Sequence, residues 1–220
     1  TGLLDATEGQ VSILGENLSK LSIKQRRDKG LAYVPEDRMT FGCAKDMSIR
    51  DNVLSTWTES KRFVQSGFLK KAEIEKFAAD SAKEYRVKCK DASQEVGMLS
   101  GGNIQKVVIA REMSQNPKLL VADQPTRGID VGSSRFIREK IVTLRDQGGA
   151  VLLVSADLRE LLEISDGIIV MYNGEITAYF ESLKGITEHD LGYYMLGVKK
   201  QDHQDIVQAF ARSATKAGEK

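Results

Sequence analysis

The chain has 220 residues, of which 41% are hydrophobic and 29% charged, and 32 Lys and Arg oppose 31 Asp and Glu, leaving a formal charge of +1. Such a chain can bury the core of one domain, or of one domain with a subdomain, and it is too apolar for general disorder. The charge balance excludes a protein that binds nucleic acid through its overall charge. Cys43 and Cys89 are the only cysteines, which excludes a disulfide framework and the familiar zinc spacings.

Short β-branched runs bounded by Gly, Pro or Asp predict strands. They lie at 10–14, 31–34, 119–122, 150–155 and 167–172. The runs at 119–122 and 150–155 are continuously apolar, as in a strand of a parallel sheet that is covered on both faces. Between them, residues 132–147 carry apolar side chains at helical spacing, so that strand, helix and strand predict a right-handed βαβ unit.

Three other segments have their own patterns. Strand signals vanish between 39 and 98, where residues 70–87 are rich in Ala, Glu and Lys with apolar residues on one helical face, which predicts a helical insertion. Asn173-Gly174 separates two apolar runs and predicts an antiparallel hairpin that joins 168–172 to 176–180. From residue 202 onward the amphipathic pattern is weak, and we expect this tail to fray.

Leu99-Ser100-Gly101-Gly102 precedes a run with helical periodicity. Ser100 is suited to cap a helix, and the two glycines let backbone amides approach a ligand without interference from a Cβ. The unpaired N–H groups and the positive end of the helix dipole favour an anion such as a terminal phosphate. Taken alone, Ser-Gly-Gly before a helix is usually only a flexible start, so the prediction depends on the neighbouring motifs.

The apolar run at 119–122 ends in Asp123, which is followed by the sequence QPTRGID. A carboxylate at the carboxyl end of a buried parallel strand lies at the crevice where such sheets bind ligands. There it can hold Mg²⁺ directly or through water. Taken alone, Asp123 is more often only a turn-forming residue at the end of a strand.

In this order, the segments LSGGNIQK, KLLVADQPTRGIDVG and VLLVSADLRELLEISDGIIVMYNGEI resemble the ATPase of ABC transporters. The resemblance is strongest to the second ATPase half of tandem importers for simple sugars and purine nucleosides. Those proteins share the GLAYVPEDR-type segment that lies at 30–38 in this chain. The resemblance covers residues 1–197. It implies an α/β fold of the P-loop NTPase type, with a mostly parallel sheet, a helical subdomain and an antiparallel edge hairpin. The motif G-x-x-x-x-G-K-S/T is absent from the 220 residues, and we expect the chain to begin just after that loop.

The resemblance assigns a role to each matching residue. The nucleotide-binding residues of the signature motif and its helix would be Leu99, Ser100, Gly101, Gly102 and Gln105. Asp123 would be the Walker B carboxylate, and Glu36 in the Q-loop would be a second metal-binding residue. The D-loop would consist of Gly128, Ile129 and Asp130.

The resemblance also implies a division of the chain into four parts. Residues 1–38 would be the truncated amino-terminal part of the ATPase core, and 39–98 a helical subdomain facing a transmembrane partner. Residues 99–180 would hold the signature, Walker B and the core sheet, and 181–220 the carboxy-terminal helices and tail.

Several positions depart from the family pattern. Gln124 occupies the position of the catalytic Glu, and because an amide cannot accept a proton at neutral pH, we expect the general-base function to be lost there. The segment Ser155-Ala156-Asp157 lacks the usual switch His, and Glu36 replaces the usual Gln. Without a P-loop to cradle the β- and γ-phosphates, the chain by itself should bind ATP weakly and be inactive.

ATP and Mg²⁺ are the implied cofactors. In this family two ATPase halves sandwich ATP head to tail, so that Ser100, Gly101 and Gly102 would complete a site whose P-loop lies in a partner half of the same polypeptide. The other implied partners are transmembrane permease subunits and, indirectly, a periplasmic or lipoprotein solute-binding protein, with no nucleic acid. The resemblance therefore places the chain peripherally on the cytoplasmic face of a bacterial membrane.

Two alternatives to an importer remain open. A soluble ABC ATPase acting on nucleic acid usually carries basic patches or long coiled-coil insertions, and neither is seen in the sequence. A catalytically inactive regulatory or dimerisation module is favoured by Gln124 and by the missing His, whereas the intact LSGG favours contact with a nucleotide. Among solutes, Gln124 within the ADQPTRG segment favours nucleosides over sugars.

Overall fold

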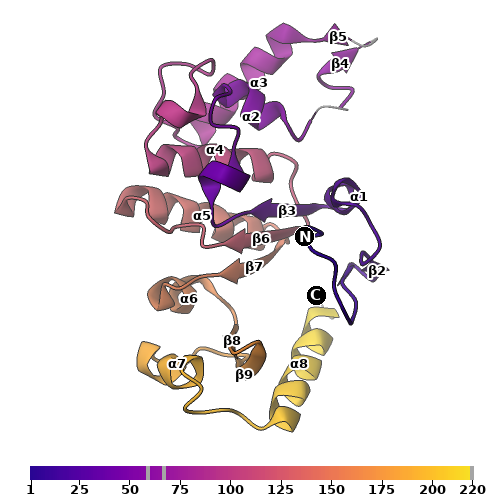
Figure 1. Cartoon of the computed structure of the whole chain (residues 1–220), viewed down its shortest axis with the longest axis vertical. Helices are drawn as coiled ribbons and strands as arrows, with labels where there is room; N and C mark the ends of the chain where they lie inside the picture. The colour runs from indigo at the N-terminus through magenta and orange to yellow at the C-terminus, as the bar shows by residue number, and fades with distance from the viewer. Residues whose placement is uncertain (58–59, 66–67, 219–220) are drawn as a thin grey trace. The chain divides into compact units, whose positions relative to one another are not determined.

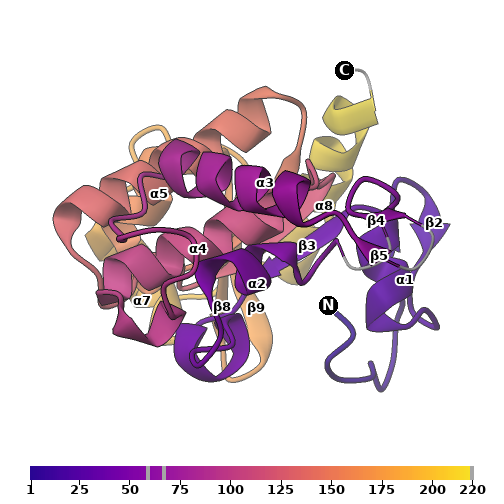
Figure 2. The same cartoon turned by 90° about the horizontal axis from the view of Figure 1, so that it is seen from above.

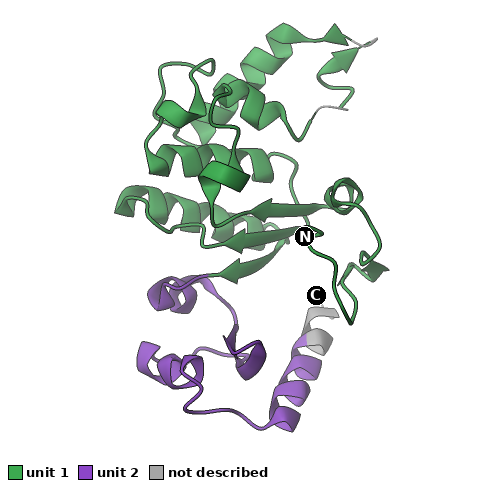
Figure 3. Cartoon of the chain, viewed as in Figure 1, with its two compact units in different colours: residues 1–154 green, residues 155–220 purple. Residues whose placement is uncertain are grey.

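The computed structural model describes residues 1–57, 60–65 and 68–218. The chain divides into two compact units, residues 1–154 and residues 155–220 (Figure 3). In the described residues, no helix combines the length and apolarity that crossing a membrane requires. The division at residues 38, 98 and 180 stays a prediction.

A three-stranded parallel sheet forms the centre of the first unit (Figure 1). Its strands are β3 (Leu31–Val34), β6 (Leu119–Asp123) and β7 (Ala150–Val154), in the order β3-β6-β7. Helix α5 (Val131–Asp146) connects β6 to the parallel β7, which confirms the predicted strand, helix and strand. All three strands therefore end at one edge of the sheet, where ligands of parallel sheets bind.

Helix α4 (Gly101–Met113) contacts both β3 and α5. It is buried along most of its length, and Ile104, Val107, Val108 and Ile109 are each at most 4% exposed. On β7, by contrast, Leu152 and Val154 are about half exposed. The prediction that both faces of this apolar strand are covered is therefore wrong for the described chain.

Residues 38–98 form a mainly helical part of the first unit (Figure 2). It contains the π-helical turn η1 (Arg38–Gly42), α2 (Ile49–Leu54), α3 (Lys71–Glu84) and the short 3₁₀ helix η2 (Val96–Met98). The predicted helix over 70–87 is confirmed as α3. The short strands β4 (Val64–Gln65) and β5 (Phe68–Leu69) were not predicted, because two residues are too few to show an alternating pattern.

The amino-terminal segment contains a small hairpin and a short helix. The strands β1 (Ser12–Ile13) and β2 (Glu16–Asn17) replace the longer strand predicted at 10–14. This strand ends early because Leu14 and Gly15 have φ of 51° and 79° and form the turn. Helix α1 (Ile23–Asp28) begins with a capping box between Ser22 and Gln25.

The second unit contains α6 (Leu158–Ile164), β8 (Ile168–Tyr172), β9 (Glu175–Phe180), α7 (Glu188–Met195) and α8 (His203–Gly218). The predicted hairpin is confirmed: β8 and β9 pair as an antiparallel two-stranded sheet, with φ of 49° at Asn173 and 81° at Gly174 in the turn. The expectation of a fraying tail is wrong for residues 203–213 of α8, while the last two residues of the chain lie outside the described residues. Ile206 is buried there and Phe210 stacks on Tyr179 with ring centroids 4.3 Å apart, so the weak amphipathic pattern suffices to dock the helix.

Candidate functional site

The start of α4 presents backbone amides without acceptors. Ser100 is the N-cap residue, and its carbonyl accepts the amides of Asn103 and Ile104 at 2.9 Å each. Its hydroxyl accepts the side-chain amide of Asn103 at 2.8 Å and caps no backbone N–H. Within the described part of the chain, the amides of Gly101 and Gly102 have no acceptor. Two free N–H groups at the positive end of a 13-residue helix suit an anion.

Packing constrains the two glycines of this segment to different degrees. A Cβ added to Gly102 would lie 2.5 Å from the Ser133 hydroxyl and 2.6 Å from Oδ2 of Asp130. A Cβ added to Gly101 would lie 2.9 Å from Nη2 of Arg38. At Gly102 the contacts include Cβ of the short Ser133 side chain, so the packing there requires a residue without a side chain, whereas at Gly101 a Cβ would displace only the tip of the flexible Arg38 side chain.

The D-loop residues lie beside the start of α4. Asp130 is the N-cap of α5, where its carboxylate accepts the backbone amide of Ser133 at 2.9 Å and the Ser133 hydroxyl at 2.7 Å. These bonds, and above all that from the hydroxyl, lower the pKa of Asp130. Gly128 has a φ of +66°, which suits a residue without a Cβ. The structure thus brings the predicted D-loop and signature motif together, with Gly102 packed on Asp130 and Ser133.

The end of β6 holds the second group of predicted residues. Asp123 is half-buried and lies opposite Val154 of β7. The backbone amide of Gln124 donates to the carbonyl of Val154 at 2.8 Å, and Gln124 has a φ of +49°, in the left-handed region. Burial raises the pKa of Tyr33 on β3, and the negative charge of Asp123 adds to this shift. Asp123 therefore lies at the edge of the sheet where its parallel strands end.

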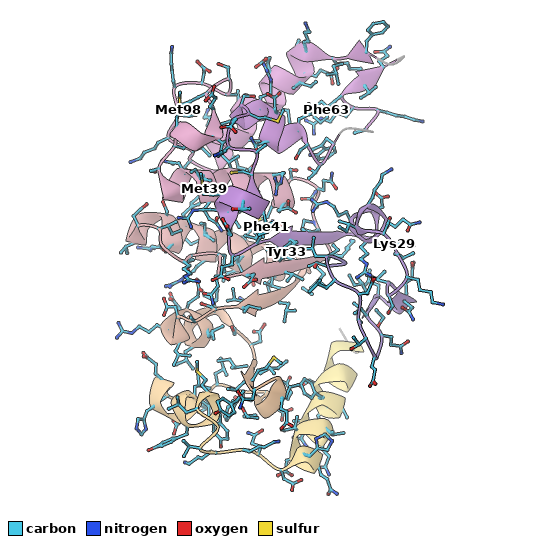
Figure 4. All side chains as sticks on the ribbon, in the orientation of Figure 1. Lys29, Tyr33, Met39, Phe41, Phe63 and Met98 are labelled. Carbon is cyan, nitrogen blue, oxygen red and sulfur yellow. The ribbon has the colours of Figure 1, made fainter. Side chains whose placement is uncertain are left out.

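Glu36 lies in the segment between β3 and η1, where Figure 4 labels the neighbouring Tyr33, Met39 and Phe41. Its carboxylate forms an ion pair with Nη1 of Arg127, next to the D-loop. The structure thus shows Glu36 in an ion pair, and its predicted metal-binding role stays a prediction.

Leu99 and Gln105 lie inside the fold. Leu99 is 9% exposed and belongs to the apolar cluster with Ile49 and Val53, while Gln105 is 2% exposed. Oε1 of Gln105 has no hydrogen-bond donor among the described residues. Both side chains are buried, and their direct contact with a nucleotide stays a prediction. Of the other residues of the motif, Ser100 is exposed, Gly101 is half-buried and Gly102 is buried.

The residues at the switch position belong to the second unit. The Ser155 hydroxyl donates to Oε2 of the fully buried Glu160 at 2.6 Å. Asp157 caps α6 by accepting the amides of Arg159 and Glu160. In this structure, therefore, the residues at the switch position support the start of α6.

Two polar groups of the first unit were not predicted from the sequence. Arg38 donates to the carbonyls of Arg127 and Gly128 at 2.9 and 3.2 Å. Glu112, which is 2% exposed on α4, pairs with Arg27 and Arg111 at 2.8 Å each. Glu112 also accepts the backbone amide of Tyr33 at 3.1 Å, so that it joins α4 to α1 and β3. The partners of Arg38 and Arg27 are about 85 to 90 residues away in the chain, where no local pattern reveals them.

These residues fit a nucleotide with its metal ion in part. The free amides of Gly101 and Gly102 and the exposed Ser100 suit phosphate oxygens. Within the described residues there is no cluster of three or more His, Cys, Asp or Glu that could hold a metal. Because Mg²⁺ is usually bound through one or two carboxylates, substrate phosphates and water, the single carboxylate of Asp123 fits an ion that is held mainly by the nucleotide.

The sequence matches the family described as ABC transporter over residues 1–127. It is 37% identical over 202 residues to the guanosine import ATP-binding protein NupO of Bacillus subtilis (strain 168). This match covers 92% of this chain and 39% of NupO. The sequence is 33% identical over 197 residues to the nucleoside import ATP-binding protein NupA of Lactococcus lactis subsp. cremoris (strain MG1363), covering 90% and 39%. It is 39% identical over 179 residues to the glucose import ATP-binding protein TsgD13 of Haloferax volcanii (strain DS2), covering 80% and 32%. The chain thus spans less than half of the length of these relatives.

Solved structures agree with the fold. A dimeric post-hydrolysis state of the ATP-binding cassette MJ0796 bound to ADP and Pi has a TM-score of 0.67 and 27% identity, covering 82% of this chain and 75% of that one. A nucleotide-free ATP-binding cassette from an ABC transporter has a TM-score of 0.63 and 23% identity, covering 95% and 79%. These similarities confirm the expected α/β fold of the ABC ATPase. With the family match over more than half of its residues, the chain belongs to the ABC transporter family, as an ATP-binding domain with the ABC cassette fold.

Proposed function

We propose that this domain couples ATP binding and hydrolysis to the import of a nucleoside or a simple sugar. The names of its relatives support the proposal, because they describe ATP-binding proteins for the import of guanosine, nucleosides, ribose and glucose. In this proposal the domain corresponds to the second ATPase half of a tandem importer. It acts with a first ATPase half and with membrane permease subunits, on the cytoplasmic face of the membrane.

The start of α4 has the central role in this proposal. ATP supplies the phosphoanhydride bond whose hydrolysis drives the transport cycle. The amides of Gly101 and Gly102 and the hydroxyl of Ser100 would bind the γ-phosphate of a nucleotide that a different lobe holds through its own P-loop. The helix dipole of α4 favours the negative charge at this position. The unpaired amides of Gly101 and Gly102 are the observation that carries this assignment.

The end of β6 would form a second, weaker site. Asp123 would contact Mg²⁺ directly or through water, whereas the Gln124 amide can orient a water molecule but cannot take its proton. The Ser155 hydroxyl donates to Glu160, and a serine hydroxyl does not replace the imidazole of a switch His. We therefore infer that a nucleotide at this second site is hydrolysed slowly or not at all.

Comparison of Ser100→Arg with Gln124→Ala in the assembled importer tests this assignment. We expect Ser100→Arg to lower ATP turnover roughly 100-fold, because the long arginine side chain would block the access of phosphate to the start of α4. We expect Gln124→Ala to leave turnover within about twofold of the wild type, because the residue replaced is no general base. Ser182→Arg, at an exposed position of the second unit, is the matched control for the added arginine.

Each outcome of this comparison has a distinct meaning. If Gln124→Ala stops ATP turnover and Ser100→Arg spares it, the assignment of the two sites is wrong. If neither substitution changes turnover, the domain acts as a regulatory or dimerisation module, the alternative that Gln124 and the missing switch His favour. Solute uptake into membrane vesicles, measured with guanosine and with ribose, separates the nucleoside importer from the sugar importer.

A further inference from the structure

The guanidinium of Arg38 lies where three segments of the first unit meet. Arg38 is the first residue of η1, which follows β3 after a short connection. Its Nη1 donates to the carbonyl of Arg127 at 2.9 Å and its Nη2 to the carbonyl of Gly128 at 3.2 Å. The same Nη2 lies 2.9 Å from the position that a Cβ of Gly101 would occupy. One side chain therefore contacts the D-loop and the start of α4 together.

Arginine is well suited to this position, and lysine is not. The planar guanidinium presents donors in a fixed fork that can bind two neighbouring carbonyls at once, whereas a lysine ammonium is a compact charge on a flexible stem. Glu36 adds a second connection between the same segments, because its carboxylate pairs with the side chain of Arg127. Residues 36–38 are thus joined to residues 127–128 by side-chain and main-chain contacts.

The D-loop carries this constraint to α4. Two residues after Gly128, Asp130 caps α5 and packs with Ser133 against Gly102. We propose that Arg38 is a positioning residue that holds the D-loop against the start of α4, so that the amides of Gly101 and Gly102 stay directed at the phosphate. The last step of this inference rests on the proposed function. The contacts of Arg38 stand independently of it.

Hydrogen exchange of individual amides in the full chain measures the structural part of the proposal. In Arg38→Lys and Arg38→Ala, we expect exchange at the amides of Arg127 and Ser133 to accelerate by about tenfold or more, because bonds from a charged donor are lost. In the wild type these amides donate to Gln124 and Asp130 at 3.1 and 2.9 Å. Amides of α3 should be unchanged. Unchanged exchange at both amides, or equal acceleration throughout residues 1–154, would overturn the proposal.

Two further variants control for the replacement of an arginine by lysine and for packing against Arg38. Arg135→Lys alters an exposed arginine that pairs with Glu139 on α5, and it should leave D-loop exchange unchanged. Gly101→Ala places a methyl group against the tip of the Arg38 side chain, so its effect on the midpoint of thermal unfolding should differ between the wild type and Arg38→Ala. Equal shifts in both backgrounds would show that Arg38 does not pack on Gly101, which would also overturn the proposal.

ATP turnover by the assembled importer, measured with MgATP, separates this inference from the proposed function. We expect Arg38→Lys to lower kcat roughly tenfold with KM within about threefold, because another lobe holds most of the nucleotide. At a temperature where the variant is folded, a fall in thermal stability alone would change neither kcat nor KM relative to the wild type. If the D-loop exchanges faster while kcat is unchanged, Arg38 still positions the D-loop, and the role of the α4 start at the phosphate is refuted.

Discussion

The start of α4 and the end of β6 are two parts of this domain that we propose to contact nucleotide, and the structure constrains them in opposite ways. At the start of α4, Gly102 has no room for a Cβ, because Asp130 and Ser133 occupy the space, and the tip of Arg38 lies against Gly101. At the end of β6, Gln124 keeps a large side chain although its φ of +49° favours glycine. One region is fixed by packing, and the other carries local backbone strain.

This difference changes what the intact signature motif indicates. From the sequence, the two glycines favour contact with a nucleotide. In the structure, packing alone is a sufficient reason for Gly102. The assignment of function therefore depends on the free amides and on the exposed Ser100, which packing does not explain. Substitutions that separate packing from ligand binding are consequently the most informative tests.

The largest effect is expected for Gly102→Ala. The added methyl group would contact Ser133 and Asp130 at 2.5 to 2.9 Å, so we expect a loss of about 3 kcal/mol in the free energy of unfolding. Denaturation by urea, followed by the fluorescence of Trp57, the single tryptophan, measures the change in this unit.

The matched control is Gly192→Ala in α7, where no atom lies within 4 Å of the added Cβ. There the same substitution should stabilise the second unit by about 0.5 to 1 kcal/mol, because alanine favours a helix. A neutral Gly102→Ala would show that the α4 start is not fixed by packing, and the contrast with β6 would then be lost.

A smaller effect of opposite sign is expected at the end of β6. Gln124→Gly relieves the left-handed strain, and we expect a gain of about 1 kcal/mol in the free energy of unfolding. Gln124→Val, with a β-branched side chain, should instead destabilise by about 1 kcal/mol or more. The same urea titration measures both. If glycine destabilises this position, side-chain contacts of Gln124 outweigh its strain, and the end of β6 is as firmly packed as the start of α4.

Local patterns in the sequence predict the elements well and their tertiary contacts poorly. The structure confirms the strands at 31–34 and 119–122, helix α5 and the Asn173-Gly174 hairpin. Each of these elements depends on composition or turn chemistry over a few neighbouring residues. Arg38 is part of the YVPEDR segment, but nothing in that segment indicates its contacts with carbonyls about 90 residues away. The parallel pairing of β3 with β6 brings these segments together.

The burial of Gln105 shows a second limit of the sequence patterns. A polar residue within an amphipathic helix is expected on its solvent face. Helix α4, however, packs against α2, α3, α5 and β3, so that few of its positions reach solvent. Glu112 is buried on the same helix for the same reason. Its carboxylate can lie inside the fold because Arg27 and Arg111 neutralise it. Contacts that surround a helix on several sides are invisible to its own periodicity.

The smallest of these effects concerns the acid response of the α4 start. The Ser133 hydroxyl and amide lower the pKa of Asp130 in the folded state, so Asp130 stabilises the fold above its unfolded pKa of about 3.9. This stabilisation is lost as the pH falls through the lower folded pKa. Asp130→Asn keeps a residue that caps helices but removes the titrating group. The variant should therefore lose less stability than the wild type between pH 5 and about pH 2.

Urea titrations at several pH values, followed by Trp57 fluorescence, measure this difference, and Asp146→Asn at the opposite end of α5 controls for the loss of one negative charge. Because Asp130 packs on Gly102 through Ser133, acid should also accelerate hydrogen exchange at the Ser133 amide in the wild type before the unit unfolds. Equal acid sensitivity of Asp130→Asn and the wild type would mean that Asp130 is not what joins the D-loop to the start of α4. The contact of Arg38 with Gly128 would then be the main connection between these two segments.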